Sequence, residues 1–310
     1  MTAHSVSGLT EYQECAAKWW FAHRSGIKLE QPPTPDQQRG SVFHAGIAAA
    51  LTDGRVEGVV AYACGQALNY ASENGVPLAI AEQATGLLEY HIPRIGINQI
   101  ITAFQFEGKP MIEWGFNATF EEVSVRGTLD AVVRHTDGRL LLLDWKLRSN
   151  PYDLAPLRMD KQLYVYAAVL RHVYGVTLDG IVQVQIRSKL PDGLKLLKGK
   201  TGGAATDYAR DIGKTTASMI KARTVGLEDA TRRKIYLRFA DKIEREMYFL
   251  NYAPMPLGHA DMVMGVVLEQ MEAMNRDTQH LPVLNAYTCK GCGWIDHCHE
   301  RTFKRGEGTQ

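Results

Sequence analysis

The residues best suited to chemistry are two aspartates and a lysine, Asp130, Asp144 and Lys146, which occur together in the stretch GTLDAVVRHTDGRLLLLDWK. Carboxylate oxygens are hard ligands that suit Mg²⁺ or Mn²⁺. A divalent cation held by Asp130 and Asp144 can polarise a phosphodiester and lower the pKa of a bound water. Asp144 and Lys146 are two residues apart, so on a strand they share a face, and Lys146 can orient or help deprotonate that water.

The register of a predicted hairpin decides whether the two carboxylates meet. The segment 136–138, Thr-Asp-Gly, has the composition of a three-residue loop, which pairs His135 with Arg139. Asp130 then lies directly across from Asp144, whereas a two- or four-residue loop would put them on opposite faces. The simpler interpretation is that the D-x-K tripeptide merely ends a strand at the surface, but four preceding leucines favour a buried central strand.

A helix predicted over 154–174 carries a second polar pair. Gln162 and Tyr166 are four residues apart, so they share one face of this helix. An amide and a hydroxyl on an otherwise apolar helix need polar partners, and a site behind the carboxylates would provide them. A helix face that happens to be half polar is the alternative interpretation.

Taken together, these residues resemble the motifs of the RecB-like PD-(D/E)XK nucleases. The matching patterns, in order along the chain, are G-x-x-D at Asp130, D-x-K at Asp144 and Lys146, and Q-x-x-x-Y at Gln162 and Tyr166. The resemblance spans about residues 8–187 and implies a Mg²⁺- or Mn²⁺-dependent deoxyribonuclease in which these five residues are catalytic.

The resemblance also implies a histidine ligand. In the family, a histidine on an upstream helix binds the metal within a pattern resembling G-x-x-x-H, which Gly40 and His44 match. The implied metal ligands are therefore His44, Asp130 and Asp144. Some members of the superfamily place a glutamate earlier in the site, which makes Glu113 an alternative acid. A salt bridge is the favoured interpretation of Glu113, so it is left out of the expected site.

Cysteines lie near both ends of the chain. Cys15 lies in the first predicted helix, and Cys289, Cys292 and Cys298 form a C-x2-C-x5-C pattern. Three cysteines with His297 or His299 could bind Zn²⁺. The four-cysteine arrangement instead resembles the iron–sulfur staple of several RecB-like families, including AddB-type nuclease domains, CRISPR-associated adaptation nucleases and phage proteins. That resemblance implies a structural 4Fe–4S cluster that ties the two ends together.

Composition limits the other classes of protein. Of the 310 residues, 45 % are hydrophobic, which predicts a folded core. The net charge is only +1, so overall charge gives no argument for DNA binding. Neither a signal peptide nor a membrane-spanning run is expected. The expected location is the cytoplasm, and a phage-encoded protein would act in the cytoplasm of its host. Sequence-neutral phosphate contacts could come from two basic clusters, Lys189, Lys195, Lys198 and Lys200, and Arg232, Arg233 and Lys234.

Periodicity predicts the elements that position these residues. Helices are expected over 7–20, 40–51, 55–74 and from 77 to at least 91, with a Pro- and Gln-rich loop over 31–40. Three antiparallel strands are expected within 111–146, then the helix over 154–174 and a strand over 180–187. Further helices are expected from about 207 to 248 and over 259–276.

The expected fold is an α/β, restriction-endonuclease-like core with a central mixed sheet flanked by helices. We divide the chain into a helical N-terminal part (1–105), a nuclease core (106–188), a basic loop with a helical extension (189–282) and a C-terminal cluster-binding segment (283–310). The leading function is a DNA exonuclease of phage, repair or recombination origin. The alternatives are a non-catalytic DNA-binding or scaffolding module of the same fold and a CRISPR-adaptation trimming nuclease.

Overall fold

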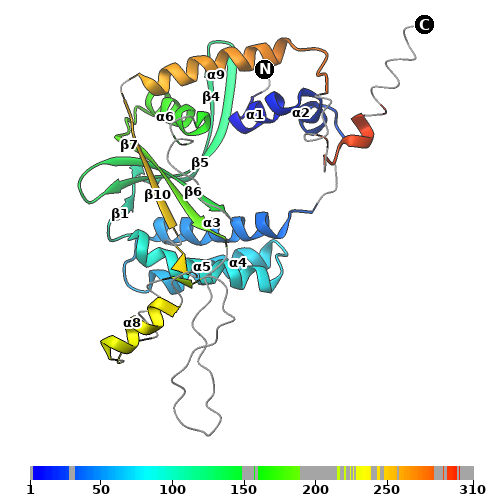
Figure 1. The fold of residues 1–310 in the computed structure, drawn as a ribbon. Helices are drawn as coiled ribbons and strands as arrows, with labels where there is room; N and C mark the ends of the chain where they lie inside the picture. The colour runs from blue at the N-terminus through cyan, green and yellow to red at the C-terminus, as the bar shows by residue number, and fades with distance from the viewer. Residues whose placement is uncertain are drawn as a thin grey trace.

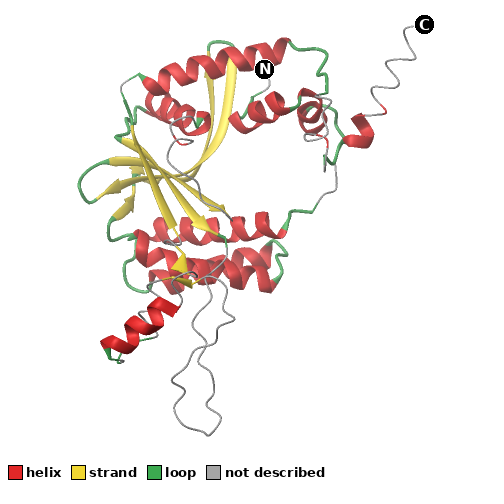
Figure 2. Ribbon diagram, in the orientation of Figure 1, coloured by secondary structure: helices red, strands yellow, loops and turns green. Residues whose placement is uncertain are grey.

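The computed structural model gives the arrangement of most of the chain. It describes residues 3–27, 32–148, 157, 160–188, 215–216, 220, 224, 226, 228–238, 243–244, 248–256, 258–282, 289, 292–298 and 300. The basic loop expected after Lys189 lies outside these residues. A central sheet lies between two helical layers, with α1, α6 and α9 on one face and α3, α4 and α5 on the other (Figures 1 and 2).

The helices agree with most of the sequence predictions. Their bounds are α1 Val6–Glu14, α2 Ala16–His23, α3 Pro35–Asp53, α4 Val59–Glu73, α5 Leu78–Ile95, α6 Lys161–Tyr174, α8 Asp229–Arg238 and α9 His259–Arg276. None of the described helices is long and apolar enough to cross a membrane.

The sheet is mixed, with strand order β1-β5-β6-β7-β10 and β4 paired to β5. These strands are β1 Ile101–Ala103, β4 Ile112–Phe120, β5 Val123–His135, β6 Leu140–Arg148, β7 Gly180–Arg187 and β10 Tyr248–Pro254. Two short pairs lie outside it, β2 Gln105–Phe106 with β3 Lys109–Pro110, and β8 Thr215–Thr216 with β9 Ile243–Glu244. The antiparallel order β4-β5-β6 and the parallel pairing of β6 with β7 confirm the predicted mixed sheet flanked by helices.

Alternating side chains of the central strands form two cores. On β6, Leu140 and Leu142 pack with α6 and α9, whereas Leu141, Leu143 and Trp145 pack with α3, α4 and α5. Asp144 and Lys146 follow Leu142 at the same period of two, so they emerge on the face that α6 covers. The prediction that Trp145 points to the opposite face is confirmed.

Two predictions for the N-terminal half are wrong. The expected loop over 31–40 is helical from Pro35, because Thr34 and Gln37 form a capping box and proline is favoured in the first helical turn. The single helix expected over 7–20 is two helices, because Cys15 adopts an extended backbone (φ −163°, ψ 108°) between α1 and α2.

The prediction for the region before α9 is also wrong in part. The helices expected over 207–248 include α8, but Tyr248 begins β10, which pairs antiparallel with β7 along seven residues. Gln183 of β7 is paired with Asn251 of β10 on one side and with Asp144 of β6 on the other. Segments far apart in the sequence thus complete one sheet.

Candidate active site

The site forms where β5 and β6 separate. Their ladder runs from Arg134–Leu140 to Ala131–Leu143, and His135 N donates to Arg139 O, which confirms the predicted hairpin register. The next positions along the two strands are Asp130 and Asp144. There the ladder ends.

Beyond this point β5 and β6 no longer pair with each other. The Asp130 carboxylate and the backbone of His4 make the hydrogen bonds there instead. The backbone N–H of Trp145 donates to Asp130 Oδ2 at 2.8 Å. The edge of β5 that β6 leaves is paired with His4, because Arg126 N donates to His4 O and His4 N to Ser124 O, both at 2.8 Å. Asp130 therefore lies where β5 and β6 separate, and its carboxylate is held beside β6.

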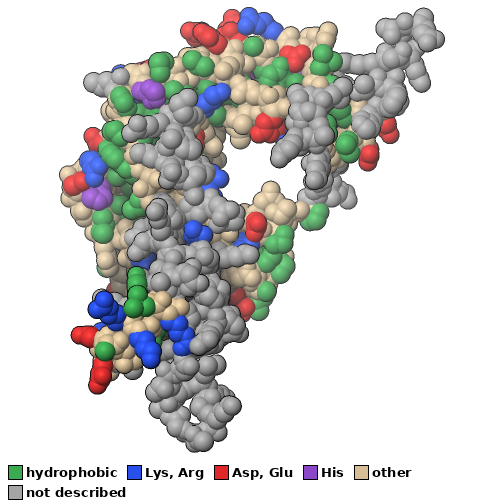
Figure 3. All heavy atoms as spheres, in the orientation of Figure 1, with side chains coloured by type: hydrophobic (Ala, Val, Ile, Leu, Met, Phe, Trp, Pro, Cys, Tyr) green, Lys and Arg blue, Asp and Glu red, His purple; other side chains and the backbone are tan. Residues whose placement is uncertain are grey.

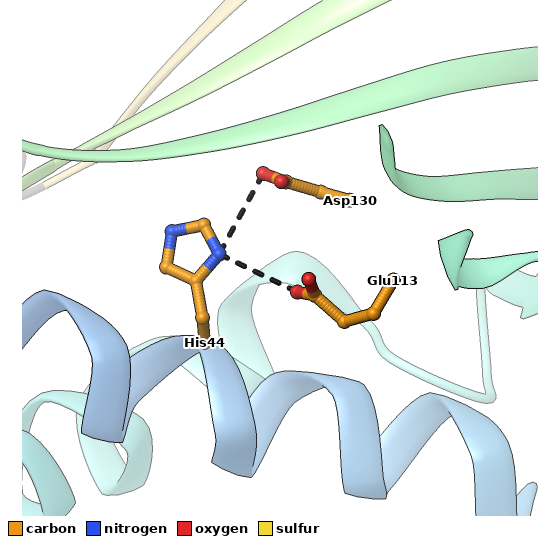
Figure 4. Close-up of side chains that lie close together, drawn as sticks. All are labelled: His44, Glu113 and Asp130. Atoms are coloured by element: carbon orange, nitrogen blue, oxygen red, sulfur yellow. Dashed lines mark ion pairs between the residues drawn. The ribbon is translucent and has the colours of Figure 1, made fainter. Parts of the chain in front are cut away.

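His44 of α3 lies beside the Asp130 carboxylate, which it approaches from the helical layer of α3, α4 and α5. His44 Nδ1 lies 3.7 Å from Asp130 Oδ2 and 3.7 Å from Glu113 Oε1 (Figure 4). His44 Nε2 lies 3.0 Å from the carbonyl oxygen of Trp145. Among the described residues, His44, Glu113 and Asp130 are the one group of three His, Cys, Asp or Glu whose ligand atoms all lie within 4.8 Å of one another.

Glu113 reaches this group through the register of β4. The flanking pairs are Ile112–Ala131 and Trp114–Leu129, so Glu113 is opposite Asp130. Its φ of +46° is rare for a residue other than glycine. Such backbone strain clusters at functional sites. The sequence interpretation favours a salt bridge for Glu113, and the structure places its carboxylate beside His44 and within the candidate metal group.

Asp144 is held by contacts on both of its oxygens. Lys146 Nζ lies 2.8 Å from Asp144 Oδ1, and Gln183 Nε2 donates to Asp144 Oδ2 at 3.1 Å. Gln185 Nε2 in turn donates to Gln183 Oε1 at 3.0 Å, and both glutamine side chains are fully buried. Asp144 is therefore fixed in position beside Asp130 and is not part of the group around His44.

Burial and neighbouring charges shift the pKa values of Asp130 and His44. Burial raises the pKa of Asp130 to about 6, and Asp144 adds to the rise while His44 opposes it. Burial would lower the pKa of His44, but Glu113 and Asp130 outweigh that effect and raise it. Glu113, Asp130 and Asp144 thus lie near one lysine and one histidine, and the carboxylate of Asp160 also acts on Lys146. This nitrogen and oxygen donor set fits a divalent cation, which would supply the missing positive charge.

Gln162 and Tyr166 lie together on α6, as their spacing predicts. Gln162 Nε2 donates to the Tyr166 hydroxyl at 2.7 Å, and burial raises the pKa of that hydroxyl. The Tyr166 ring packs over Gly127, where a Cβ would lie only 2.7 Å from Tyr166 Cε1 and 2.8 Å from Phe116 Cζ. The glycine of the G-x-x-D pattern is thus required by the tyrosine of the Q-x-x-x-Y pattern.

A cleft of about 860 Å³ opens beside the candidate metal group, which is formed by His44, Glu113 and Asp130. His44 and Glu113 belong to its wall. The other lining residues come from the start of α3 and from α4, and they are Pro33, Gln37, Gly40, Ser41, Ala45 and Tyr70. The candidate cation site is therefore accessible from solvent.

The two ends of the chain pack together near the cysteines. Cys15 is buried and is the N-cap residue of α2, and Phe21 of α2 stacks on Trp294 with ring centroids 5.6 Å apart. Cys292 and Cys298 flank Trp294 in sequence. The sulfurs of the described cysteines do not form a group within 4.8 Å, and His299 lies outside the described residues.

Of the two predicted basic clusters, the structure describes the one on α8. Arg232, Arg233 and Lys234 are exposed there, and Figure 3 shows Lys and Arg side chains gathered over this helix. The lysines after β7 lie outside the described residues.

A comparison with models of protein families identifies the superfamily of this chain. The profile of the PD-(D/E)XK nuclease superfamily matches residues 3–299. The chain belongs to that superfamily. No curated protein matches the sequence. A solved structure from Eubacterium rectale, described as a "putative exonuclease", is 10 % identical with a TM-score of 0.48, and the match covers 94 % of this chain and 86 % of that one.

Proposed function

We propose that the protein is a Mg²⁺- or Mn²⁺-dependent deoxyribonuclease that hydrolyses phosphodiester bonds at DNA ends. The observation that carries the proposal is the meeting of His44, Glu113 and Asp130 at one point, next to Asp144 and Lys146. A bound divalent cation supplies Lewis acidity to a phosphodiester and acidity to a water. Membership of the superfamily supports the same chemistry.

The position of each residue in the site suggests its proposed role. His44 on α3 and Asp130 on β5 would hold the cation, and Asp144 on β6 would lie beside it as a further carboxylate. Glu113 would be a further ligand, since its Oε1 lies as near to His44 Nδ1 as Asp130 Oδ2 does. Lys146, held at 2.8 Å by Asp144, orients the attacking water and offsets charge on the phosphate in the transition state.

The proposed role of Tyr166 is to donate a hydrogen bond to the phosphate. Its oxygen accepts a hydrogen bond from Gln162, so its own proton is available to donate to a phosphate oxygen. The charges of Lys146, Asp130 and Asp144 all act on this hydroxyl, which is consistent with a place at the site.

We further propose that Cys15, Cys289, Cys292 and Cys298 hold a 4Fe–4S cluster. The stacking of Phe21 on Trp294 supports this proposal, because it brings the helix that begins at Cys15 against the segment that contains Cys292 and Cys298. Four thiolates are the usual ligands of such a cluster. Its role here is to join the two ends of the chain.

The nuclease proposal is tested with end-labelled single- and double-stranded DNA, anaerobic protein and added Mn²⁺. Cleavage should require the metal and stop with a chelator. Lys146→Ala should abolish cleavage and keep DNA binding. Asp137→Asn is the matched control, because Asp137 lies in the same hairpin but pairs with Arg139 at the exposed turn. Full cleavage by Lys146→Ala, or in excess chelator, contradicts the mechanism.

The cluster proposal has a separate test. Anaerobically purified protein should be brown and contain about four iron and four sulfide per chain. A colourless protein with stoichiometric zinc would show that the cysteines form a zinc site instead.

A further inference from the structure

Two arginines stand at the ends of the parallel strands β6 and β7. Arg148 is the last residue of β6 and Arg187 is the last residue of β7, and the two are register partners. Neighbouring strands lie roughly 4.8 Å apart. The pairing is intact at this point, because Ser188 N donates to Arg148 O at 3.0 Å. The register therefore brings two side chains of like charge together at one end of the sheet.

Both arginines lie on the face of the sheet that carries the candidate active site. Register partners on parallel strands point to the same face, and side chains return to that face every two residues. Asp144 and Gln183 are such partners, and a hydrogen bond of 3.1 Å joins their side chains. Arg148 and Arg187 each follow one of these partners by four residues, so they continue the same face. Lys146 lies between Asp144 and Arg148 on it.

The two guanidinium groups are partly withdrawn from water. Arg148 and Arg187 are half-buried, and the Nε atom of each is buried. Like charges in neighbouring positions repel each other, and they do so more strongly where water is partly excluded. An anion bound between the two groups offsets that repulsion. The planar, forked guanidinium group is particularly suited to the oxygens of a phosphate.

A third arginine fixes the strand ends from the opposite face. Arg39 of α3 is only 7 % exposed, and its Nη1 donates to Ser188 O at 3.0 Å. The charge of Arg39 is balanced by Asp36, with which it forms an ion pair. Arg39 thus anchors the residue that follows Arg187 against α3. The arginine pair is therefore held in position before any ligand binds, which reduces the entropy lost on binding.

The distance along β6 indicates which phosphate the pair would bind. Two residues of a strand cover about 7 Å, which is close to the separation of neighbouring phosphates along a nucleic acid strand. Lys146 is the residue proposed to act at the scissile phosphate, and Arg148 is two residues further along the same face.

We infer that Arg148 and Arg187 together bind the phosphate group next to the scissile phosphodiester on the same DNA strand. The ligand chemistry is that of a phosphate, either an internal phosphodiester or a terminal phosphate group. The inference rests on the proposed nuclease function. It deepens that function by adding a binding site that determines where along the strand the cut falls.

The first test substitutes the arginines and measures binding apart from cleavage. A fluorescent single-stranded oligonucleotide is titrated into Lys146→Ala protein with Ca²⁺ at several salt concentrations, and anisotropy is recorded. Adding Arg148→Gln or Arg187→Gln should weaken binding on the order of 10-fold. The two together should lower the slope of log Kd against log salt concentration by about one. Arg134→Gln is the matched control, because it removes the same charge from an exposed position of β5 and should bind normally.

The second test needs no arginine substitution, so it decides the matter even if the glutamine variants do not fold in melting curves. Oligonucleotides made neutral with methylphosphonate linkages carry one phosphodiester, two adjacent ones, or two separated by a neutral linkage. The adjacent pair should bind on the order of 10-fold more tightly than the single phosphodiester, and the separated pair should show little advantage. A further strand, with one phosphodiester next to a terminal phosphate, distinguishes an internal from a terminal ligand.

Two outcomes overturn the inference. One is a folded double variant of Arg148 and Arg187 with unchanged affinity and salt slope. The other is equal binding of the adjacent and the separated phosphates by protein that contains both arginines. If the adjacent phosphates bind more tightly through the arginines although the wild-type protein cleaves nothing, the phosphate site stands and the nuclease proposal fails.

Discussion

Asp130 should make the metal-free protein less stable at neutral pH, and Asp130→Asn should reverse this. Burial raises the pKa of Asp130 from 3.8 to about 6. The folded state binds the proton of Asp130 more tightly than the unfolded state does, so protonation of Asp130 stabilises the fold. This contribution to stability is complete below about pH 4 and is lost as the pH rises through about 6. The difference between these pKa values corresponds to about 3 kcal/mol.

The asparagine keeps the acceptor for the Trp145 N–H and removes only the charge. With chelator at pH 8, Asp130→Asn should therefore be more stable than the wild type by up to about 3 kcal/mol. At pH 4 the two proteins should be nearly equal. The raised pKa of His44 acts in the same direction, because its contribution is also lost as pH rises above its ordinary 6.5.

The assay is urea unfolding in chelator at pH 4 and pH 8, repeated at pH 8 with Mn²⁺. Mn²⁺ should stabilise the wild type strongly and the variant little. Asp137→Asn controls for a carboxylate of the same hairpin, since pairing with Arg139 lowers the pKa of Asp137. A variant that is no more stable than the wild type at pH 8 in chelator would refute the reasoning.

Three further predictions follow from contacts around the site. Gln183→Leu removes the buried hydrogen-bond donor to Asp144 Oδ2. The Mn²⁺ concentration needed for half-maximal cleavage should therefore rise on the order of 10-fold. An unchanged metal titration would contradict the role of Gln183. Gly127→Ala places a methyl group against Tyr166 and should cost about 1–3 kcal/mol in thermal unfolding; an unchanged melting temperature contradicts that packing. Cys298→Ser should lower the melting temperature and solubility while leaving the Mn²⁺ titration of residual cleavage unchanged, and unaltered stability argues against the staple.

The central strands could be predicted because their signals are local. Four leucines before Asp144 indicate a buried strand, and the loop over 136–138 determines the register that brings Asp130 opposite Asp144. The start of α3 also has local signals, because Thr34, Pro35 and Gln37 form a helix start, but the prolines and glutamines around it favour a loop.

Long-range pairing could not be predicted in the same way. β10 is separated from its partner β7 by about sixty residues of chain, and nothing in its own sequence identifies that partner. Glu113 was a different omission. The register of β4 on β5 places it opposite Asp130, but that register depends on pairing between strands that the sequence pattern does not determine.

The pairing of β10 with β7 also governs how the protein can be handled. β7 is buried along nearly its entire length, and without β10 its outer edge would present unpaired N–H and C=O groups on an apolar strand. Such an edge is a template for intermolecular strand addition. A fragment cut after Arg187 retains every proposed catalytic residue yet should precipitate on expression, because it lacks β10, which protects the outer edge of β7 from aggregation.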